Sequence, residues 1–249
     1  MRLPCLFAAA LALAAPIMPA HAGLDCPAAP RMSVLRLPHL RTALARGTEG
    51  VIVALGSSST EGVMASDLAH SYPAVLQAAL SRALPNAHLA VLNRGIGGQD
   101  APEELARLTS DVIAVQPQLV IWQVGANGAL RNADPAEFRE LVTAGVTRLQ
   151  EAGIDVVLMD NQHTPRVDAA PEHGVLNQVL AEVAKATGAS LFARSVLMDG
   201  WAEEGAPSLQ FVAIDGLHHN NRGYHCVAEA LAGEIVTAVH TAPTLAAAR

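Results

Sequence analysis

The sequence predicts an α/β fold, namely a three-layer α/β/α sandwich around a five-stranded parallel sheet. The first observation behind this prediction is an alternation of short apolar runs, which suit buried parallel strands, with longer segments of helical period. The second is that polar, glycine-containing segments follow several of the apolar runs. Because open parallel sheets bind ligands beyond the carboxyl ends of their strands, these segments indicate where a functional site would lie.

Five apolar runs are predicted to form the sheet. In chain order they are Val51–Leu55, Leu89–Asn93, Leu119–Gln123, Val156–Met159 and Ser190–Phe192. Runs of this kind suit strands that are covered by helices on both faces.

Segments of helical period lie between these runs. The clearest are Pro73–Ala83, Pro102–Val115, Pro135–Ala152 and Val175–Thr187, and a last helix, Asn221–Val239, should pack back on the sheet. Three of the first four begin with proline, which is favoured in the first turn because its missing N–H would have no helical partner there. Gly153 and Gly188 follow the last two of these four as expected C-cap residues.

The chain is expected to form one domain behind an export signal. Within residues 1–22, Arg2 supplies a positive start, LFAAALALAAPIM an apolar stretch, and the final AHA small residues for cleavage. Residues 23–249 would then be the single mature domain. Its lead-in, 23–50, should have little regular structure apart from a short helix around Leu40–Arg46, and its tail, 241–249, should be frayed.

Charge and hydropathy limit the possible partners. The formal net charge is -7, and loss of Arg2 with the signal makes the mature chain more acidic. An acidic chain is a poor binder of nucleic acid or of an anionic membrane surface. After the signal, no segment has about 20 uninterrupted apolar residues, which argues against stable membrane insertion. The expected location is the periplasm or the medium, and the sequence leaves the oligomeric state open.

Two cysteines, Cys26 and Cys226, remain after removal of the signal. In an oxidising compartment an even pair predicts one disulfide, which would tie the mature N-terminus to the C-terminal segment. Two buried free thiols are the alternative.

Four polar segments contain the groups that acyl transfer by a serine requires. Their sequences are GSSSTEG, NRGIGGQD, GANG and DGLHHNNRGY. Asp215 and His218 are three residues apart, so one turn of helix-like backbone would let the carboxylate orient the imidazole as a base. The backbone N–H of Gly98 and the side-chain amide of Asn127 are candidate donors to an oxyanion.

The order of these segments resembles the SGNH hydrolases, also called the GDSL esterase/lipase superfamily, whose blocks contribute Ser, Gly, Asn and His in that order. The blocks of that family are similar to Gly56-Ser57-Ser58, to Asn93, Gly95 and Gly98, to Gly125-Ala126-Asn127, and to Asp215-Gly216-Leu217-His218. The resemblance implies a flavodoxin-like SGNH hydrolase fold that needs no cofactor.

The same resemblance implies roles for individual residues. Ser58 would be the nucleophile, His218 its base and Asp215 the acid that orients the base. The oxyanion hole would consist of the N–H groups of Ser58 and Gly98 with the side chain of Asn127. The sequence departs from the family at Ser57, which stands where the family usually carries an aspartate, and its role is left open.

The remaining polar residues receive simpler assignments. Ser59 and Thr60 are expected to be cap or turn residues. Asp160 and Asn161 follow a strand and are expected to line a substrate pocket. The other nearby histidines match no zinc motif and are expected to be solvated surface residues, so no metal site is predicted: His163, His173, His219 and His225.

The predicted function is an exported serine esterase that acts on a small-molecule or glycan ester, with short-chain acyl or O-acetyl groups favoured. A periplasmic polysaccharide O-acyltransferase with the same triad is one alternative, since an acceptor sugar could replace water in the second step. A catalytically silent carbohydrate-binding protein of the same fold is the other. The sequence does not define the acyl chain length or the alcohol.

Overall fold

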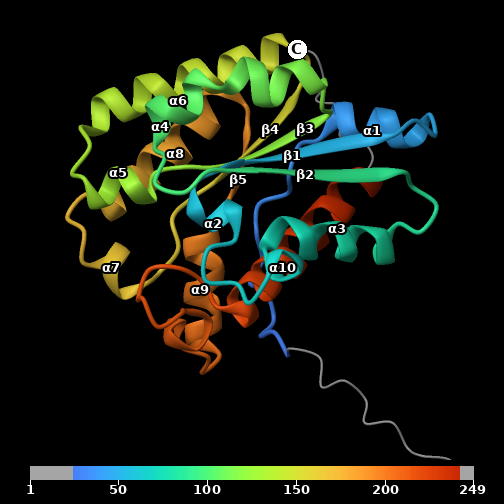
Figure 1. The fold of residues 1–249 in the computed structure, drawn as a ribbon. Helices are drawn as coiled ribbons and strands as arrows, with labels where there is room; N and C mark the ends of the chain where they lie inside the picture. The colour runs from blue at the N-terminus through green and yellow to red at the C-terminus, as the bar shows by residue number, and fades with distance from the viewer. Residues whose placement is uncertain (1–24, 242–249) are drawn as a thin grey trace, which may run out of the picture.

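A five-stranded parallel sheet forms the centre of the protein. The structure, a computed structural model, describes residues 25–241. The strands lie in the order β2-β1-β3-β4-β5. They are β1 (Gly50–Gly56), β2 (Leu89–Gly95), β3 (Leu119–Gln123), β4 (Asp155–Met159) and β5 (Ser190–Phe192). The predicted strands and the three-layer fold class are thereby confirmed (Figure 1).

The strand order places a switch point between β1 and β3. β1 pairs with both neighbours in parallel, so that Gly56 lies opposite Gly95 of β2 and Leu55 opposite Trp122 of β3. The carboxyl ends of these three strands therefore meet at one edge of the sheet. Open sheets of this flavodoxin-like order bind ligands at that edge.

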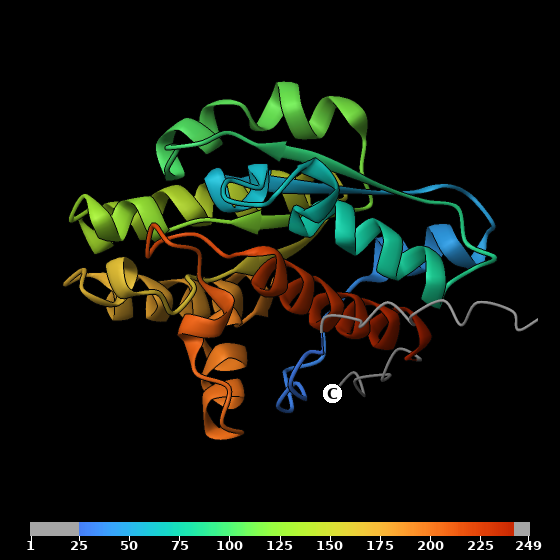
Figure 2. The same cartoon turned by 60° about the horizontal axis from the view of Figure 1, so that its bottom comes forward.

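Long helices cover both faces of the sheet. One face carries α4 (Ala101–Ala106), α6 (Pro135–Glu151) and α8 (His173–Thr187); the other carries α1 (Pro38–Ala45), α3 (Tyr72–Ala83) and α10 (Asn221–His240). Figure 1 shows α6 and α8 on one side and α3 and α10 on the other, and Figure 2 shows α10 beside α3.

The side chains of β1 explain why its sequence is apolar throughout. Ile52 and Ala54 join the core on the side of α3 and α10, whereas Val53 and Leu55 join the core on the side of α6 and α8. Successive side chains of a strand point to opposite faces, so a strand between two helical layers needs apolar residues at every position.

Several shorter helices escape the sequence-based prediction. They are α2 (Ser58–Glu61), α5 (Ala126–Leu130), α7 (Pro165–Asp168) and α9 (Arg194–Glu203), with 3-10 turns at Leu68–His70 and Ser208–Phe211. The glycine inside α9 has a packing reason, because a Cβ on Gly200 would lie 2.8 Å from the ring of Pro30. The lead-in thus crosses α9 at a point where no side chain would fit.

The predicted helix Pro102–Val115 is wrong as a single element. α4 begins with a capping box at Asp100 and ends at Ala106; a π-helical turn, Leu108–Val112, and a 3-10 turn, Ile113–Val115, follow. At the break, Arg107 points back to the sheet and donates through Nη2 to the carbonyl of Gly56 at 3.0 Å. The helical period of the sequence does not reveal this contact between distant segments.

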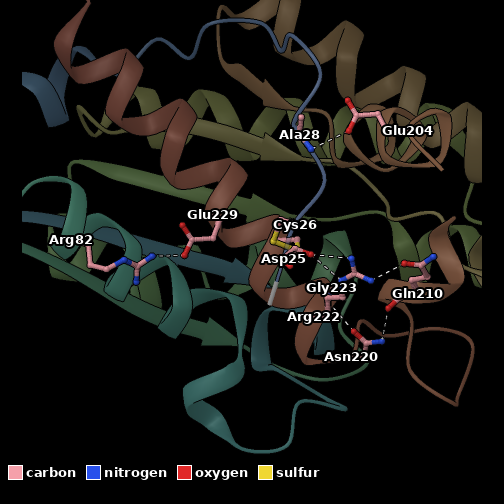
Figure 3. The surroundings of a disulfide bond; sticks show 11 residues. Asp25, Cys26, Ala28, Arg82, Glu204, Gln210, Asn220, Arg222, Gly223 and Glu229 are labelled. Atoms are coloured by element: carbon pink, nitrogen blue, oxygen red, sulfur yellow. Dashed lines mark hydrogen bonds and ion pairs between the residues drawn. A yellow bond between two sulfur atoms is a disulfide. The ribbon is translucent and has the colours of Figure 1, made fainter. Parts of the chain in front are cut away.

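The lead-in is fixed to the C-terminal helix. Cys26 and Cys226 form a disulfide with an S–S distance of 2.04 Å, which confirms the predicted pairing (Figure 3). Beside it, Arg222 Nη2 donates to the carbonyl oxygen of Asp25 at 3.0 Å. Residues 25–37 contain no helix or strand, and the predicted short helix follows as α1.

Two predicted segments cannot be compared with the structure. The signal sequence, residues 1–22, lies outside the described residues, as does all of the predicted frayed tail except Thr241. Between residues 25 and 241 no helix is long and apolar enough to cross a membrane.

Candidate active site

Ser58 lies at the junction of β1 and α2. The strand ends at Gly56, and the helix begins at Ser58 itself, with only Ser57 between them. A Cβ on Gly56 would lie 2.3 Å from Thr60 Oγ1 and 2.9 Å from the carbonyl oxygen of Gln123. Glycine is therefore required for the tight turn that presents Ser58 at the sheet edge.

A continuous series of hydrogen bonds joins Ser58 to a carboxylate. His218 Nε2 lies 2.7 Å from Ser58 Oγ, and His218 Nδ1 lies 2.5 Å from Asp215 Oδ2. The other carboxylate oxygen, Asp215 Oδ1, accepts the backbone N–H groups of Leu217 and His218, each at 3.0 Å. Asp215 thus orients both the imidazole and the backbone that carries it.

This geometry comes from a turn rather than a helix. Residues 214–218 form a turn and bends in which Gly216 has a φ of +66°. The three-residue spacing of Asp215 and His218 still brings the side chains together, but the helix-like backbone expected from that spacing is wrong. The aspartate stabilises the turn itself by accepting N–H groups two and three residues ahead.

Hydrogen bonds keep Asp215 ionised. Burial acts to raise its pKa, but the hydrogen bonds from the His218 ring and from two backbone N–H groups outweigh burial, and the pKa lies below its ordinary value. A permanently charged carboxylate favours the His218 tautomer that has its proton on Nδ1. Nε2 is then left as the acceptor that faces Ser58.

The turn after β2 passes beside Ser58. A Cβ on Gly97 would lie 3.9 Å from Ser58 Cβ, and Gly98 has a φ of +78°. Arg131 Nη2 donates to the carbonyl oxygen of Gly98 at 2.6 Å and so fixes the peptide that follows this glycine. Within residues 25–241, neither the N–H of Ser58 nor that of Gly98 has a protein acceptor. Both are free to donate to an oxyanion.

Asn127 lies in the first turn of α5, after β3. Its Nδ2 donates to the carbonyl oxygen of Gln99 at 2.7 Å. One amide proton is therefore used to fix the side chain against the turn that contains Gly98, and the other remains for a ligand. The predicted G-x-N segment thus lies next to the predicted glycine turn.

Asn93 and Gly95 of the second polar segment have structural roles. A Cβ on Gly95 would lie 2.0 Å from the backbone nitrogen of Glu61, so only glycine lets the end of β2 approach α2. Asn93 Oδ1 accepts the N–H of Gly95 at 2.8 Å, and its Nδ2 donates to the carbonyl oxygen of Glu61 at 3.4 Å. Both residues join the second polar segment to the helix that begins with Ser58.

The hydroxyl run separates into one accessible member and three buried ones. Ser57, Ser59 and Thr60 are 4%, 3% and 0% exposed. Gln123, the last residue of β3, accepts three donors on its Oε1: Ser57 N–H, Ser57 Oγ and Thr60 Oγ1, each at 3.2 Å. The sequence-based interpretation uses Gln123 only as a strand end and misses this role, although a glutamine that ends an apolar strand is a signal.

Asp160 and Asn161 lie in the interior and not on an open pocket wall. Asp160 is 3% exposed, and its carboxylate accepts from Ser195 Oγ at 2.5 Å and from Ser195 N–H at 3.0 Å. Asn161 is fully buried. The expectation that both line the substrate pocket is corrected by this burial, because Asp160 already has partners in α9 and Asn161 has no exposed surface.

A buried network beneath the turn that carries Asp215 and His218, called the catalytic turn below for its proposed role, also escapes the sequence-based prediction. Gln162 Nε2 donates to the carbonyl oxygen of Leu217 at 2.9 Å, between Asp215 and His218. Arg194, which is 1% exposed, donates to Gln162 Oε1 at 2.6 Å and to the carbonyl oxygen of Asp160 at 2.8 Å. These side chains connect β4 and α9 to the turn.

The expectation of solvated histidines is wrong for His219. This residue is fully buried, its Nδ1 lies 3.1 Å from the carbonyl oxygen of Phe211, and burial lowers its pKa to about 3. His163 and His173 are partly buried and lie next to each other, with ring centroids 5.3 Å apart.

The fold and this site together define the class. A flavodoxin-like sheet with a serine, a histidine and an aspartate joined by hydrogen bonds at its carboxyl edge is the arrangement of the SGNH hydrolases. Within that class, the chain belongs to the Non-GDSL lipase-like family, which matches residues 25–241. No curated protein matches the chain.

Solved structures with the same fold include two esterases and TesA. A two-domain esterase, CEX, active on acetylated mannans and co-crystallized with mannopentaose, has a TM-score of 0.70 at 20% identity. Axe2, an acetylxylan esterase from Geobacillus stearothermophilus, has a TM-score of 0.64 at 19% identity, and TesA one of 0.62 at 22%. At these identities the likeness shows a shared fold.

The extent of the matches differs among the neighbours. The match to CEX covers 84% of this chain but 55% of CEX, so the chain spans about half of that two-domain protein. The match to Axe2 covers 78% of this chain and 95% of Axe2, and the match to TesA covers 74% and 97%.

Proposed function

We propose that this chain is an exported serine esterase that hydrolyses short-chain acyl or O-acetyl esters through an acyl-enzyme on Ser58. The observation that carries the proposal is the series Asp215–His218–Ser58, with contacts of 2.5 and 2.7 Å. A serine hydroxyl is a weak nucleophile unless a base takes its proton, and the imidazole is in position to do so.

The reaction proceeds in two halves. His218 Nε2 accepts the proton of Ser58 Oγ as this oxygen attacks the ester carbonyl carbon and forms a tetrahedral intermediate. The carbon–oxygen bond to the alcohol then breaks, and the imidazolium returns its proton to the leaving alcohol oxygen. In the second half, His218 takes a proton from water, the hydroxide adds to the acyl carbon, and Ser58 leaves with that proton.

Three donors stabilise the negative oxygen of each intermediate. They are the backbone N–H groups of Ser58 and Gly98 and the second amide proton of Asn127, none of which has a protein acceptor in the described chain. Loss of one such donor costs about 100- to 1,000-fold in rate. Because the donors belong to a helix start and to a turn held by Arg131, they need little reorganisation as charge develops.

The proposed substrate class is an acetyl or other short acyl ester, with a glycan as the favoured alcohol. CEX acts on acetylated mannans and Axe2 is an acetylxylan esterase, and both share the fold. The disulfide between Cys26 and Cys226 supports export, because structural disulfides persist in oxidising compartments.

Two measurements test the function and the substrate class. A fluorophosphonate probe should label the protein on the tryptic peptide that contains Ser58, and p-nitrophenyl esters from C2 to C16 should show highest kcat/KM at C2 to C4. An optimum at C8 or longer would replace the proposed substrate by a lipid or thioester. Absence of both labelling and hydrolysis would refute the esterase and favour a silent carbohydrate-binding protein.

A further inference from the structure

Four side chains that can bind a metal ion come together outside the proposed active site. His163 follows β4, Asp168 ends α7, His173 begins α8 and Asp199 lies in α9. His163 Nδ1 lies 2.8 Å from Asp168 Oδ1, and His173 Nε2 lies 3.5 Å from the same oxygen. One carboxylate oxygen therefore faces both imidazoles.

His173 lacks the hydrogen bonds that a mostly buried imidazole normally makes. Its side chain is 12% exposed, and its Nδ1 is buried with no hydrogen-bond partner in the described part of the chain. The 3.5 Å separation of Nε2 from Asp168 is too long for a good hydrogen bond. It is close to the ~3.3 Å between two ligand atoms of a tetrahedral zinc ion with bonds of ~2.0 to 2.1 Å.

The charges of the cluster also suit a cation. Asp168 and Asp199 contribute two formal negative charges that a divalent cation would neutralise.

Asp199 adds the partner that ligating histidines usually have. His163 Nε2 lies 3.4 Å from Asp199 Oδ1, slightly beyond hydrogen-bond distance, and a small rotation of the exposed Asp199 side chain would complete the bond. A histidine that binds a metal through one nitrogen commonly donates its other N–H to a carboxylate, which fixes the tautomer. When Nε2 of His163 carries the proton, Nδ1 has a free lone pair that points toward Asp168, where the ion would lie.

We propose that His163, Asp168 and His173 bind one divalent transition-metal ion of the zinc class, with Asp199 as the hydrogen-bonding partner of His163. One ligand atom of each of the three residues lies within 4.8 Å of the others. Ligand atoms of a tetrahedral zinc ion are ~3.3 Å apart, so binding requires a closure of at most ~1.5 Å. Because Asp168 Oδ1 already lies 2.8 Å and 3.5 Å from the two imidazoles, this closure brings the two rings together, and rotation of the partly exposed His163 side chain can supply it.

The site would stabilise the support of the catalytic turn. Arg166 of α7 donates its N–H to the carbonyl oxygen of Gly216 at 3.0 Å, one residue after Asp215. An ion held by His163, Asp168 and His173 would join the loop after β4 to both ends of the α7–α8 connection. Its role is structural, because the proposed acyl transfer needs no metal.

Zinc binding to the untagged, chelator-treated protein tests the proposal. One Zn²⁺ per chain should bind in equilibrium dialysis, and the Tm should rise by ~5 to 10 °C at a free Zn²⁺ concentration 100 times Kd. Co²⁺ should give the visible absorption of a tetrahedral nitrogen and oxygen site. His163→Ala and Asp168→Asn, at partly exposed positions, should each weaken binding by at least ~10-fold.

A second histidine–aspartate pair supplies the matched control. His70 Nδ1 lies 2.8 Å from Asp67 Oδ1, as in the proposed site, but this pair has no second imidazole. His70→Ala and Asp67→Asn should leave zinc affinity unchanged. Ser58→Ala should bind zinc normally, so the outcome is independent of the esterase proposal. Absence of zinc binding by the wild type, or full binding by both His163→Ala and Asp168→Asn, would overturn the site.

Discussion

Gln123 fixes the turn between β1 and α2, which presents Ser58, although it makes no hydrogen bond with Ser58 itself. Its Oε1 accepts the N–H and hydroxyl of Ser57 and the hydroxyl of Thr60, and Thr60 Oγ1 also lies 3.4 Å from the hydroxyl of Tyr72. Ser57, which replaces the usual aspartate of the resembling family, is thus a buried donor to Gln123. A carboxylate there would face an oxygen acceptor.

Gln123→Leu should lower the free energy of unfolding by ~1 to 3 kcal/mol, because it leaves the buried N–H and hydroxyl of Ser57 without an acceptor and Thr60 with only the long contact to Tyr72. Loss of these contacts should also reduce kcat by loosening the turn before Ser58. Urea denaturation and ester hydrolysis measure the two effects.

Ser57→Ala is the matched comparison, since it removes a donor and leaves no donor unpaired. It should cost under ~1 kcal/mol and retain most activity. Equal losses of stability in the two variants would contradict the role of Gln123.

Single residues also set the limit of sequence-based inference. Spacing pairs Asp215 with His218, the resemblance to the SGNH hydrolases implies Ser58, and the structure brings these three together. The predicted pocket position of Asp160 is wrong, because a polar side chain after a strand can point inward, here to Ser195, as easily as outward. Partners of buried polar groups depend on distant segments, and no local pattern identifies them.

At the scale of elements, α10 connects the catalytic turn to the lead-in. The helix begins at Asn221, three residues after His218, and carries Cys226 in its second turn. Cys226 forms a disulfide with Cys26 across a sequence separation of 200 residues. The bond fixes the irregular segment 25–37 against the helix.

Cys26→Ala should lower the free energy of unfolding by ~2 to 5 kcal/mol, because the disulfide restricts the unfolded chain over a long loop. The rate at 25 °C should change little, since hydrogen bonds through Asp215 and Gln162 hold the turn. Thermal unfolding with and without reductant measures the effect, and the variant should be insensitive to reductant. A wild-type Tm that does not change on reduction would disprove that the disulfide stabilises the fold.

Elements also differ in how well the sequence predicts them. The strands and the helices α3, α6, α8 and α10 match the predicted segments within two residues at each end, because their apolar periods and prolines are local signals. The break after α4 does not match the predicted helix, because it depends on the contact of Arg107 with the distant Gly56. Short helices such as α2 and α7 are too brief to show a period.

At the scale of the whole molecule, two buried groups make opposing contributions to the variation of stability with pH. Burial raises the pKa of Glu104 to about 8, although the hydrogen bond from Trp122 and the charge of Arg107 lower it. The unfolded chain loses this proton near pH 4.5, so stability falls as the pH rises from about 4.5 to 8. His219, with a folded pKa of about 3 and an unfolded value of 6.5, removes stability as the pH falls from about 6.5 to 3.

The two effects oppose each other between about pH 4.5 and 6.5, where the contribution of this pair should be nearly flat. Glu104→Gln keeps an acceptor for Trp122 and removes the titration. Because both proteins keep His219, the wild type should lose ~1.4 kcal/mol per pH unit relative to the variant from about pH 4.5 to about pH 8. Thermal unfolding from pH 4 to 9 measures the difference, and parallel curves for the two proteins would contradict it.

The central claim is that Ser58, and none of its hydroxyl neighbours, attacks the ester. The most direct test is hydrolysis of p-nitrophenyl acetate by Ser58→Ala, Ser57→Ala and Ser59→Ala under one set of conditions. Ser58→Ala should lose ~10⁴-fold or more in kcat, while the other two variants retain much of the wild-type rate. An active Ser58→Ala beside an inactive Ser59→Ala would contradict the account.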